Sequence, residues 1–227
     1  MTDRDLANEV AHTARMLAAA GLVEAFGHVS SRLPDGGFLI TPTSPLHEAT
    51  AASIITVDDD GVVVDDPSSA APIEIPLHTA VYQARPDVVA ICRGHGPSMV
   101  AWGVSLDDVP LLHGLGAIAG KVIPVHNDLD LISSPEAGGR AALTLSDNHA
   151  ALLLANGGFA VGASLLEAAT RLWFTEERAT VALAARTVEP PVGDWGHRLT
   201  HSRIELIRAE AWFSSRFTYL SSTTFQE

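Results

Sequence analysis

Apolar residues recur along the chain at two spacings, one typical of helices and the other of strands. Spacing of three or four residues over 4–20, 76–85 and 165–185 predicts three helices, and a proline in the first turn favours a fourth over 97–102. Short apolar or alternating runs between glycine, proline and acidic turns indicate strands at 29–33, 38–40, 54–57, 61–64, 88–92, 121–125 and 150–154. This mixture predicts a layered α/β domain with antiparallel pairing across its short turns.

Chain length and the lack of internal repeats favour one main domain. The 227 residues are enough to bury a sizeable core. We expect this domain to occupy residues 1–190 and a C-terminal arm to follow Pro190-Pro191, over residues 191–227. The arm combines apolar residues with charges of both signs, so we expect it to pack on the domain or on a neighbouring subunit, not on a membrane.

Composition narrows the classes of partner and location. A net charge of −13 argues against nucleic acid, because nucleic-acid binding needs a basic surface. No apolar run approaches the roughly 18–20 residues that cross a bilayer, and the first residues are charged and unlike a signal peptide. A single cysteine, Cys92, cannot form an intramolecular disulfide, so we expect a cytoplasmic protein with Cys92 as an inert core thiol.

Polar residues follow two of the predicted strands. Arg93 and His95 come directly after the apolar run 88–92, and an Asn-Gly-Gly segment at 156–158 follows another run. Ligands bind where strands of an α/β sheet end, and glycines there let a ligand or a second backbone approach closely. Glu74 precedes the helix that leads into the first of these strands. We therefore expect one chemical site, centred on His95.

Six short motifs occur in order between residues 6 and 185. They are Gly-His-Val-Ser-Ser-Arg at 27–32, Ile-Thr-Pro-Thr-Ser at 40–44, Glu-Ile-Pro-Leu-His at 74–78, Tyr-Gln-Ala-Arg-Pro-Asp-Val-Val-Ala at 82–90, Arg-Gly-His at 93–95, and Asn-Gly-Gly at 156–158 with Gly-Ala-Ser-Leu-Leu-Glu-Ala at 162–168. Together they resemble the class II aldolase/adducin family. The resemblance implies a three-layer α/β/α domain with a central, largely antiparallel sheet. It also implies a homotetramer with active sites at subunit boundaries.

The resemblance further implies a metal site, from which this sequence departs. Aldolases of the family hold a divalent metal, commonly zinc, with a His-x-His pair and a third histidine, while an acidic residue handles the proton. Here Glu74 is the acid and His95 the second histidine, but Arg93 and Gly157 stand where the other two histidines belong. Since zinc normally needs three protein ligands and arginine is never one, either the metal is lost or other histidines complete the site. The candidates are His28, His113 and His126, the last two by reaching in from a neighbouring subunit.

Two interpretations of Arg93 are open from the sequence. Its planar guanidinium suits a substrate carboxylate, but an arginine at a strand end also pairs readily with an acid such as Glu74. The phosphate-binding loop of the family is altered, because His28 replaces the usual asparagine and Ile73 replaces a serine. A small carboxylate substrate therefore fits this sequence better than a sugar phosphate.

These residues predict a carbon–carbon lyase, most simply a decarboxylase acting on a hydroxylated aromatic acid, as in the dihydroxyphthalate-type branch of the family. Two alternatives are a metal-dependent aldolase or epimerase with a rebuilt metal site, and a non-catalytic binding protein like the adducin branch. The assigned residues are Glu74 and His95 as catalytic; Arg93, His28, Thr43, Ser44 and Asn156 as substrate-binding; and His95 and His113 as ligands of a divalent metal, zinc or similar.

Overall fold

A central sheet organises the computed structural model, which describes residues 2–23, 26–64, 70–186 and 203–223. The strands of this part of the chain lie in the order β3-β2-β1-β4-β7-β6-β5, and neighbours are antiparallel except β5 and β6, which run parallel. The strands are β1 (His28–Arg32), β2 (Phe38–Ile40), β3 (Ile55–Val57), β4 (Ala90–Gly94), β5 (Val125–His126), β6 (Ala150–Leu153) and β7 (Gly158–Gly162).

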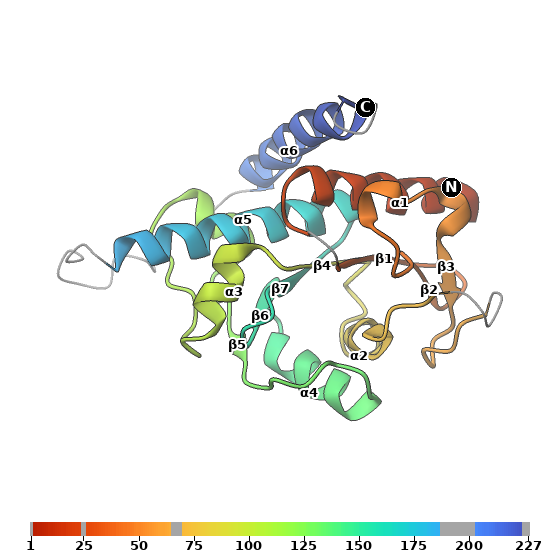
Figure 1. Cartoon of the computed structure of the whole chain (residues 1–227), viewed down its shortest axis with the longest axis horizontal. Helices are drawn as coiled ribbons and strands as arrows, with labels where there is room; N and C mark the ends of the chain where they lie inside the picture. The colour runs from red at the N-terminus through yellow and green to blue at the C-terminus, as the bar shows by residue number, and fades with distance from the viewer. Residues whose placement is uncertain (1, 24–25, 65–69, 187–202, 224–227) are drawn as a thin grey trace.

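Helices cover both faces of the sheet and give three layers (Figure 1). α1 and α5 lie on one face, with α6 on their outer side and α3 against α5, whereas α2 and α4 lie together on the opposite face. The helices are α1 (Asp3–Ala19), α2 (Ile75–Ala84), α3 (Pro97–Gly103), α4 (Pro135–Leu145), α5 (Leu165–Ala185) and α6 (Arg203–Thr223), with short 3-10 turns η1 (Leu46–Glu48), η2 (Ala51–Ser53) and η3 (Leu115–Ala119). The predicted α/β/α fold with a largely antiparallel sheet is confirmed. Within the described residues, none of these helices is long and apolar enough to span a membrane.

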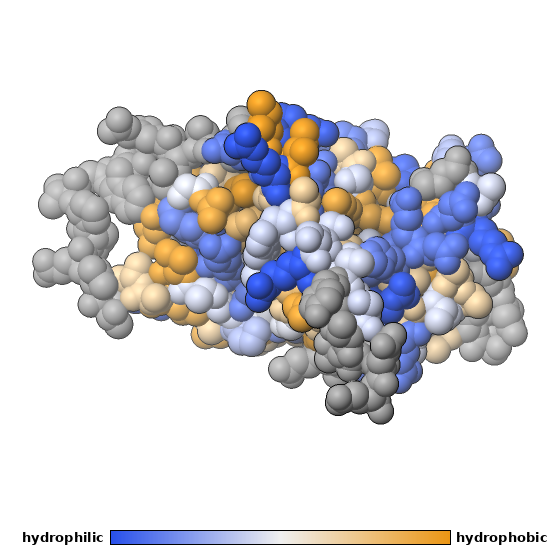
Figure 2. Space-filling model, turned by 90° about the horizontal axis from the view of Figure 1, so that it is seen from above, coloured by the Kyte–Doolittle hydropathy of each residue, from blue (hydrophilic) through white to orange (hydrophobic). Residues whose placement is uncertain are grey.

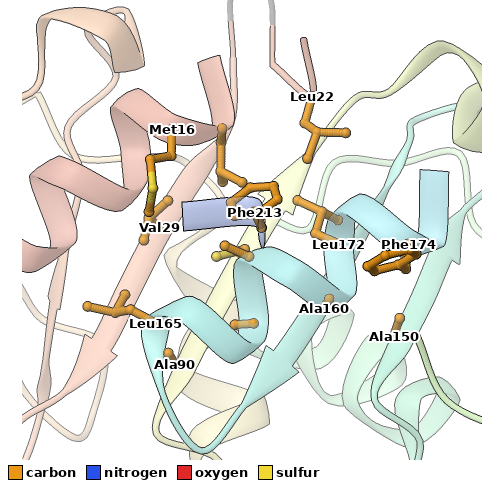
Figure 3. Packing of buried hydrophobic residues seen from close by; sticks show 14 of the residues in the cluster. Met16, Leu22, Val29, Ala90, Ala150, Ala160, Leu165, Leu172, Phe174 and Phe213 are labelled. Carbon is orange, nitrogen blue, oxygen red and sulfur yellow. The ribbon is translucent and has the colours of Figure 1, made fainter. Parts of the chain in front are cut away.

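Alternation along the strands divides the core between the two faces of the sheet. Val29, Cys92 and Ala160 point toward α1 and α5, where the packed side chains are drawn in Figure 3. Ile91 and Phe159 point toward α2 and α4. Cys92 is a free, fully buried thiol whose pKa is raised by burial, so its expected position in the core is confirmed. Each fully buried Val, Ile or Phe of this kind stabilises the fold by roughly 1.5–3 kcal/mol.

The strand predictions near the site need three corrections. β4 spans Ala90–Gly94 instead of the predicted 88–92. Because it ends two residues later than predicted, Arg93 lies inside the strand. The predicted strand at 61–64 is wrong, because Val63 makes only an isolated bridge among the described residues. The strand expected at 121–125 is reduced to β5, which begins where that run ends. Short apolar runs give no information on where a ladder starts, because pairing depends on the neighbouring strand.

Helix α4 was not predicted, because its sequence contains two adjacent glycines. Ser134 caps its first turn and Pro135 opens it, which are ordinary start signals. Gly138 and Gly139 nevertheless lower its intrinsic helix propensity. A Cβ on Gly138 would collide with the carbonyl group of Pro76, so the glycine lets α4 approach α2 closely. Tertiary packing therefore stabilises a helix that its own sequence favours weakly.

The C-terminal helix α6 packs on the rest of the chain. Four of its side chains are buried against α1 and α5: Leu206, Ala209, Phe213 and Phe217. Seen from the side that carries α6, apolar residues remain among hydrophilic ones at the surface (Figure 2), and Trp212 is 44% exposed. The predicted boundary at 190/191 lies outside the described residues, and contact of the arm with a neighbouring subunit stays a prediction.

Candidate functional site

The sheet brings the predicted polar residues onto the face that α2 covers. His28 of β1 lies opposite Arg93 of β4 in antiparallel register, so their side chains lie next to each other on one face. Glu74 is the N-cap residue of α2, but its carboxylate contacts Arg93 instead of capping the helix. Three segments that are distant in sequence therefore meet at one place beneath the N-terminus of α2.

Arg93 and Glu74 form a buried ion pair at the centre of this group. The Nε of Arg93, which is 0% exposed, donates to Glu74 Oε2 at 3.3 Å, and His28 Nδ1 lies 4.0 Å from the same oxygen. Nη1 of Arg93 donates to the carbonyl groups of Gly94 and Gly158. Burial lowers the pKa of Arg93, but the negative charge of Glu74 opposes this effect and the guanidinium stays protonated. The pairing interpretation of Arg93 is thus confirmed, and its Nη2 has no hydrogen-bond partner among the described residues.

His95 lies beyond the end of β4 and is a neutral base near pH 7. Its Nδ1 lies 2.9 Å from the carbonyl oxygen of Phe26. Because a carbonyl only accepts, Nδ1 carries the proton and Nε2 keeps a lone pair. Burial and, to a smaller extent, the charge of Arg93 lower the pKa of His95, while hydrogen bonds to Phe26 and to the Asn156 side chain raise it, and the net pKa is about 4. Asn156 therefore lies next to His95, and its assignment as a substrate-binding residue stays a prediction.

Helix α5 fixes the segment that follows His95. The carboxylate of Glu176 accepts hydrogen bonds from the backbone amides of Ser98 and Met99, both at 2.9 Å, and so caps the first turn of α3. A Cβ on Gly96 would collide with this carboxylate. Sequence reasoning missed Glu176, although α3 begins with a proline and lacks a Ser, Thr, Asp or Asn cap. A helix start without a local cap is the signal that a distant side chain supplies one.

Three predicted residues lie away from the ion pair. Thr43 and Ser44 are exposed, and Thr43 bonds to the carbonyl group of Ala70. His113 lies against α5, where its Nε2 is 3.6 Å from Glu177 Oε1. Across the described residues, no hydrogen bond or ion pair joins these three to Arg93, Glu74 or His95. Their assignments as substrate-binding or metal-binding residues stay predictions.

Three further polar residues belong to the group and were not assigned to the site from the sequence. His78 and Tyr82 follow Glu74 at intervals of four residues on α2, so all three lie on one side of the helix. Ser30 lies two residues after His28 in β1 and points to the same face of the sheet. Hydrogen bonds join Ser30 to both His78 and Tyr82. The four-residue spacing of Glu74, His78 and Tyr82 was the available signal in the sequence.

The donor set at this site does not fit the three-histidine metal centre of the family. Arg93 places a fixed positive charge where the first imidazole belongs, and it forms an ion pair with the acid Glu74. At Gly157, where the third imidazole belongs, a Cβ would collide with the carbonyl oxygen of Gly94, and φ is +73°. Among the described residues, no group of three or more His, Cys, Asp or Glu side chains is arranged to hold a metal ion. The predicted metal ligation by His95 and His113 has no support in this arrangement.

Comparison with known proteins decides the family. Residues 8–183 match the class II aldolase and adducin N-terminal domain. The chain belongs to the class II aldolase/adducin family. It is 31% identical over 181 residues to L-fuculose phosphate aldolase of Escherichia coli O6:H1, covering 78% of this chain and 80% of the relative.

Two further similarities extend this result. The chain is 27% identical over 191 residues to 3,4-dihydroxyphthalate decarboxylase of Rhodococcus jostii, covering 77% of this chain and 78% of that protein. Its fold is similar to that of L-fuculose 1-phosphate aldolase from Glaciozyma antarctica, with a TM-score of 0.78 at 20% identity, covering 99% of this chain and 92% of the other. The relatives thus include both aldolases and decarboxylases, which indicates a lyase and leaves the type of reaction open.

Proposed function

We propose that this protein is a carbon–carbon lyase that removes CO2 from a small hydroxylated, aromatic carboxylic acid. The observation that carries the proposal is the buried guanidinium of Arg93, which replaces an imidazole of the family's metal site and keeps Nη2 without a partner among the described residues. A guanidinium binds a carboxylate through charge-assisted hydrogen bonds. The similarity to a dihydroxyphthalate decarboxylase supports the same substrate class.

The charge change during the reaction indicates which carboxylate Arg93 holds. A carboxylate that leaves becomes neutral CO2, so a cation bound to it stabilises the ground state more than the transition state. A second carboxylate that stays on the ring keeps its charge throughout. Arg93 therefore promotes the reaction by holding the retained carboxylate, and a dicarboxylate is the better substrate.

His95 and Glu74 supply the proton chemistry in this proposal. The neutral His95 accepts a hydrogen bond at Nε2 from the ring hydroxyl, which makes the ring more electron-rich. The ring carbon takes up one proton, delivered through Glu74 or a water molecule, as the bond to the leaving carboxylate breaks. One carboxylate and one proton are consumed, and one CO2 and one new C–H bond are formed.

A second candidate is aldol cleavage, favoured by the retained acid Glu74 and by the 31% identity to an aldolase. In that case other histidines together with His95 would have to bind the metal, and the bound metal would be lost when His95 is replaced.

A non-catalytic binding role is the third candidate. In each case we propose a cytoplasmic protein that binds a small molecule and forms the homotetramer that the family resemblance implies.

The test is CO2 release from 2-hydroxybenzoate and from hydroxyphthalates, using protein purified without a metal-chelating tag. We expect release from a hydroxyphthalate, a loss of about 10²–10⁴ in kcat for His95→Gln, and a KM at least about tenfold higher for Arg93→Lys with the dicarboxylate only. Bound metal at one ion per chain that disappears in His95→Ala, with cleavage of a sugar phosphate, would support the aldolase instead. Ligand binding without turnover of any compound would support the binding protein.

A further inference from the structure

A row of buried hydrogen bonds leads away from the ion pair, between α2 and the sheet. Ser30 Oγ lies 2.7 Å from His78 Nδ1 and 2.7 Å from Tyr82 Oη. All three side chains are buried, and the ring of Phe38 lies against both His78 and Tyr82. No chemistry proposed above uses this row, although it begins one helical turn from Glu74.

The lengths of these hydrogen bonds favour one direction along the row. Burial raises the pKa of Tyr82, so its phenol keeps its proton. Tyr82 can donate to Ser30 Oγ at 2.7 Å or to the Val89 carbonyl at 3.5 Å, and only the first distance is that of a strong hydrogen bond. We infer that Tyr82 donates to Ser30 and that Ser30 in turn donates to Nδ1 of His78. Because burial also lowers the pKa of His78 to about 3, the ring is neutral and its single proton lies on Nε2.

His78 Nε2–H is then one of two buried donors at this place. His78 Nε2 and Arg93 Nη2 have no hydrogen-bond partner in the described part of the chain, and the same is true of Glu74 Oε1 and His28 Nδ1. Three contacts link the four side chains in series: Arg93 Nε and Glu74 Oε2 are 3.3 Å apart, His28 Nδ1 and Glu74 Oε2 are 4.0 Å apart, and the ring centroids of His28 and His78 are 5.6 Å apart. Buried polar groups are normally paired, so the cluster is complementary to one small ligand that mainly accepts hydrogen bonds.

We propose that His78 is a substrate-binding residue, whose Nε2–H and the Nη2–H of Arg93 together hold one carboxylate group of the ligand. Ser30 and Tyr82 are positioning residues, because they keep the proton of His78 on the nitrogen that faces the ligand. The ligand class rests on the proposed function. The donor pair itself does not depend on it, because any small carboxylate would be bound in the same way.

The test uses phthalate as the probe and isothermal titration calorimetry on the full chain. His78→Asn removes the donor at Nε2, and we expect phthalate to bind about tenfold or more weakly, since a hydrogen bond to a charged group is lost. His78→Gln places an amide N–H near the same position and should restore most of the affinity. Tyr82→Phe should weaken binding by a smaller factor. His12→Asn is the matched control. The ring of His12, on α1, also bonds to a hydroxyl, that of Thr218 on α6, but it lies away from the candidate site.

Nitrogen-15 spectra of histidine-labelled wild-type protein measure the tautomer directly, independently of any variant. We expect His78 to carry its proton on Nε2, and Tyr82→Phe to shift the population toward Nδ1. A proton on Nδ1 in the wild type, or equal phthalate affinity in His78→Asn, would overturn the proposal, as would a wild type that does not bind phthalate and holds only buried water. If no acid is decarboxylated but the binding pattern holds, the proposed function fails and the role of His78 stands. If His78→Asn releases CO2 with an unchanged KM, the proposed function stands and the role of His78 in substrate binding fails.

Discussion

The buried pair of Arg93 and Glu74 gives the sharpest test of the site's electrostatics. In Arg93→Met the carboxylate of Glu74, which is 4% exposed, loses its partner inside the protein. Removing one member of a buried ion pair typically costs about 3–5 kcal/mol, because the other charge stays buried and unpaired. For a chain of 227 residues this corresponds to a fall in Tm of roughly 6–20 °C. The double variant Arg93→Met/Glu74→Gln removes both charges and should regain at least about half of the lost stability.

Urea unfolding of the two single variants and the double variant gives the coupling energy as a thermodynamic cycle. Arg140→Met is the matched control, because Arg140 and Asp128 form a shorter ion pair, at 2.6 Å, with the Arg140 side chain 52% exposed. An exposed pair of this kind contributes about 0.2–1 kcal/mol, so we expect a small change in the urea midpoint. Burial and not distance decides the size of the effect. Additive losses in the cycle, or equal losses in Arg93→Met and Arg140→Met, would refute this reasoning.

Three more predictions follow from the same geometry. Because the pKa of His95 is lowered to about 4 from 6.5, the unfolded chain binds a proton that the folded chain does not, so the free energy of unfolding should decrease as pH falls from 6.5 to 4. Urea midpoints at several pH values check this, and His95→Gln should show a shallower decrease. Glu176→Ala should lose about 1 kcal/mol of stability and lower the rate of CO2 release, since the cap that fixes the segment after His95 is gone. Gly157→Ala should be destabilised by about 1–3 kcal/mol and Gly114→Ala by far less. Of these two glycines, only Gly157 has a positive φ, and only there would an added Cβ collide with the backbone. Equal melting temperatures of the two variants would contradict this reasoning.

Sequence patterns predicted the helices α1 and α5 well, predicted α6 only as an arm, and predicted the short strands less well. Helices such as α1 and α5 carry several turns of consistent apolar spacing, so their bounds differ from the predicted ones by at most one residue. β7 was not predicted as a strand, because Phe159, Ala160 and Val161 are too few to show a period and glycines stand at both ends. That strand forms because it pairs with β4 on one side and β6 on the other. Pairing partners are a property of the fold and not of the segment.

For the candidate site too, some features were visible in the sequence and others depended on the assembled fold. The motif around His95 gave the predicted position of the candidate site, and the sequence itself shows the departures from the family at Arg93 and Gly157. Whether Arg93 pairs with Glu74 depends on the register of β4 and on the place where α2 begins, so the sequence left both interpretations open. The direction of the hydrogen bonds at His78 depends on a difference between 2.7 and 3.5 Å, which only the assembled structure contains.

The replacement of imidazole by guanidinium bears directly on the choice between the two reactions. Aldol cleavage leaves negative charge on oxygen atoms of an enediolate, which a directly bound divalent cation stabilises strongly. A guanidinium already paired with Glu74 offers hydrogen bonds to an anion but no coordination site for two oxygens. Decarboxylation of a phenolic acid needs less of such stabilisation, because a proton on the ring carbon can neutralise the charge that develops there. Arg93 in place of a metal ligand, the lack of room for a side chain at Gly157 and the neutral base His95 are the features on which our proposal of decarboxylation rests.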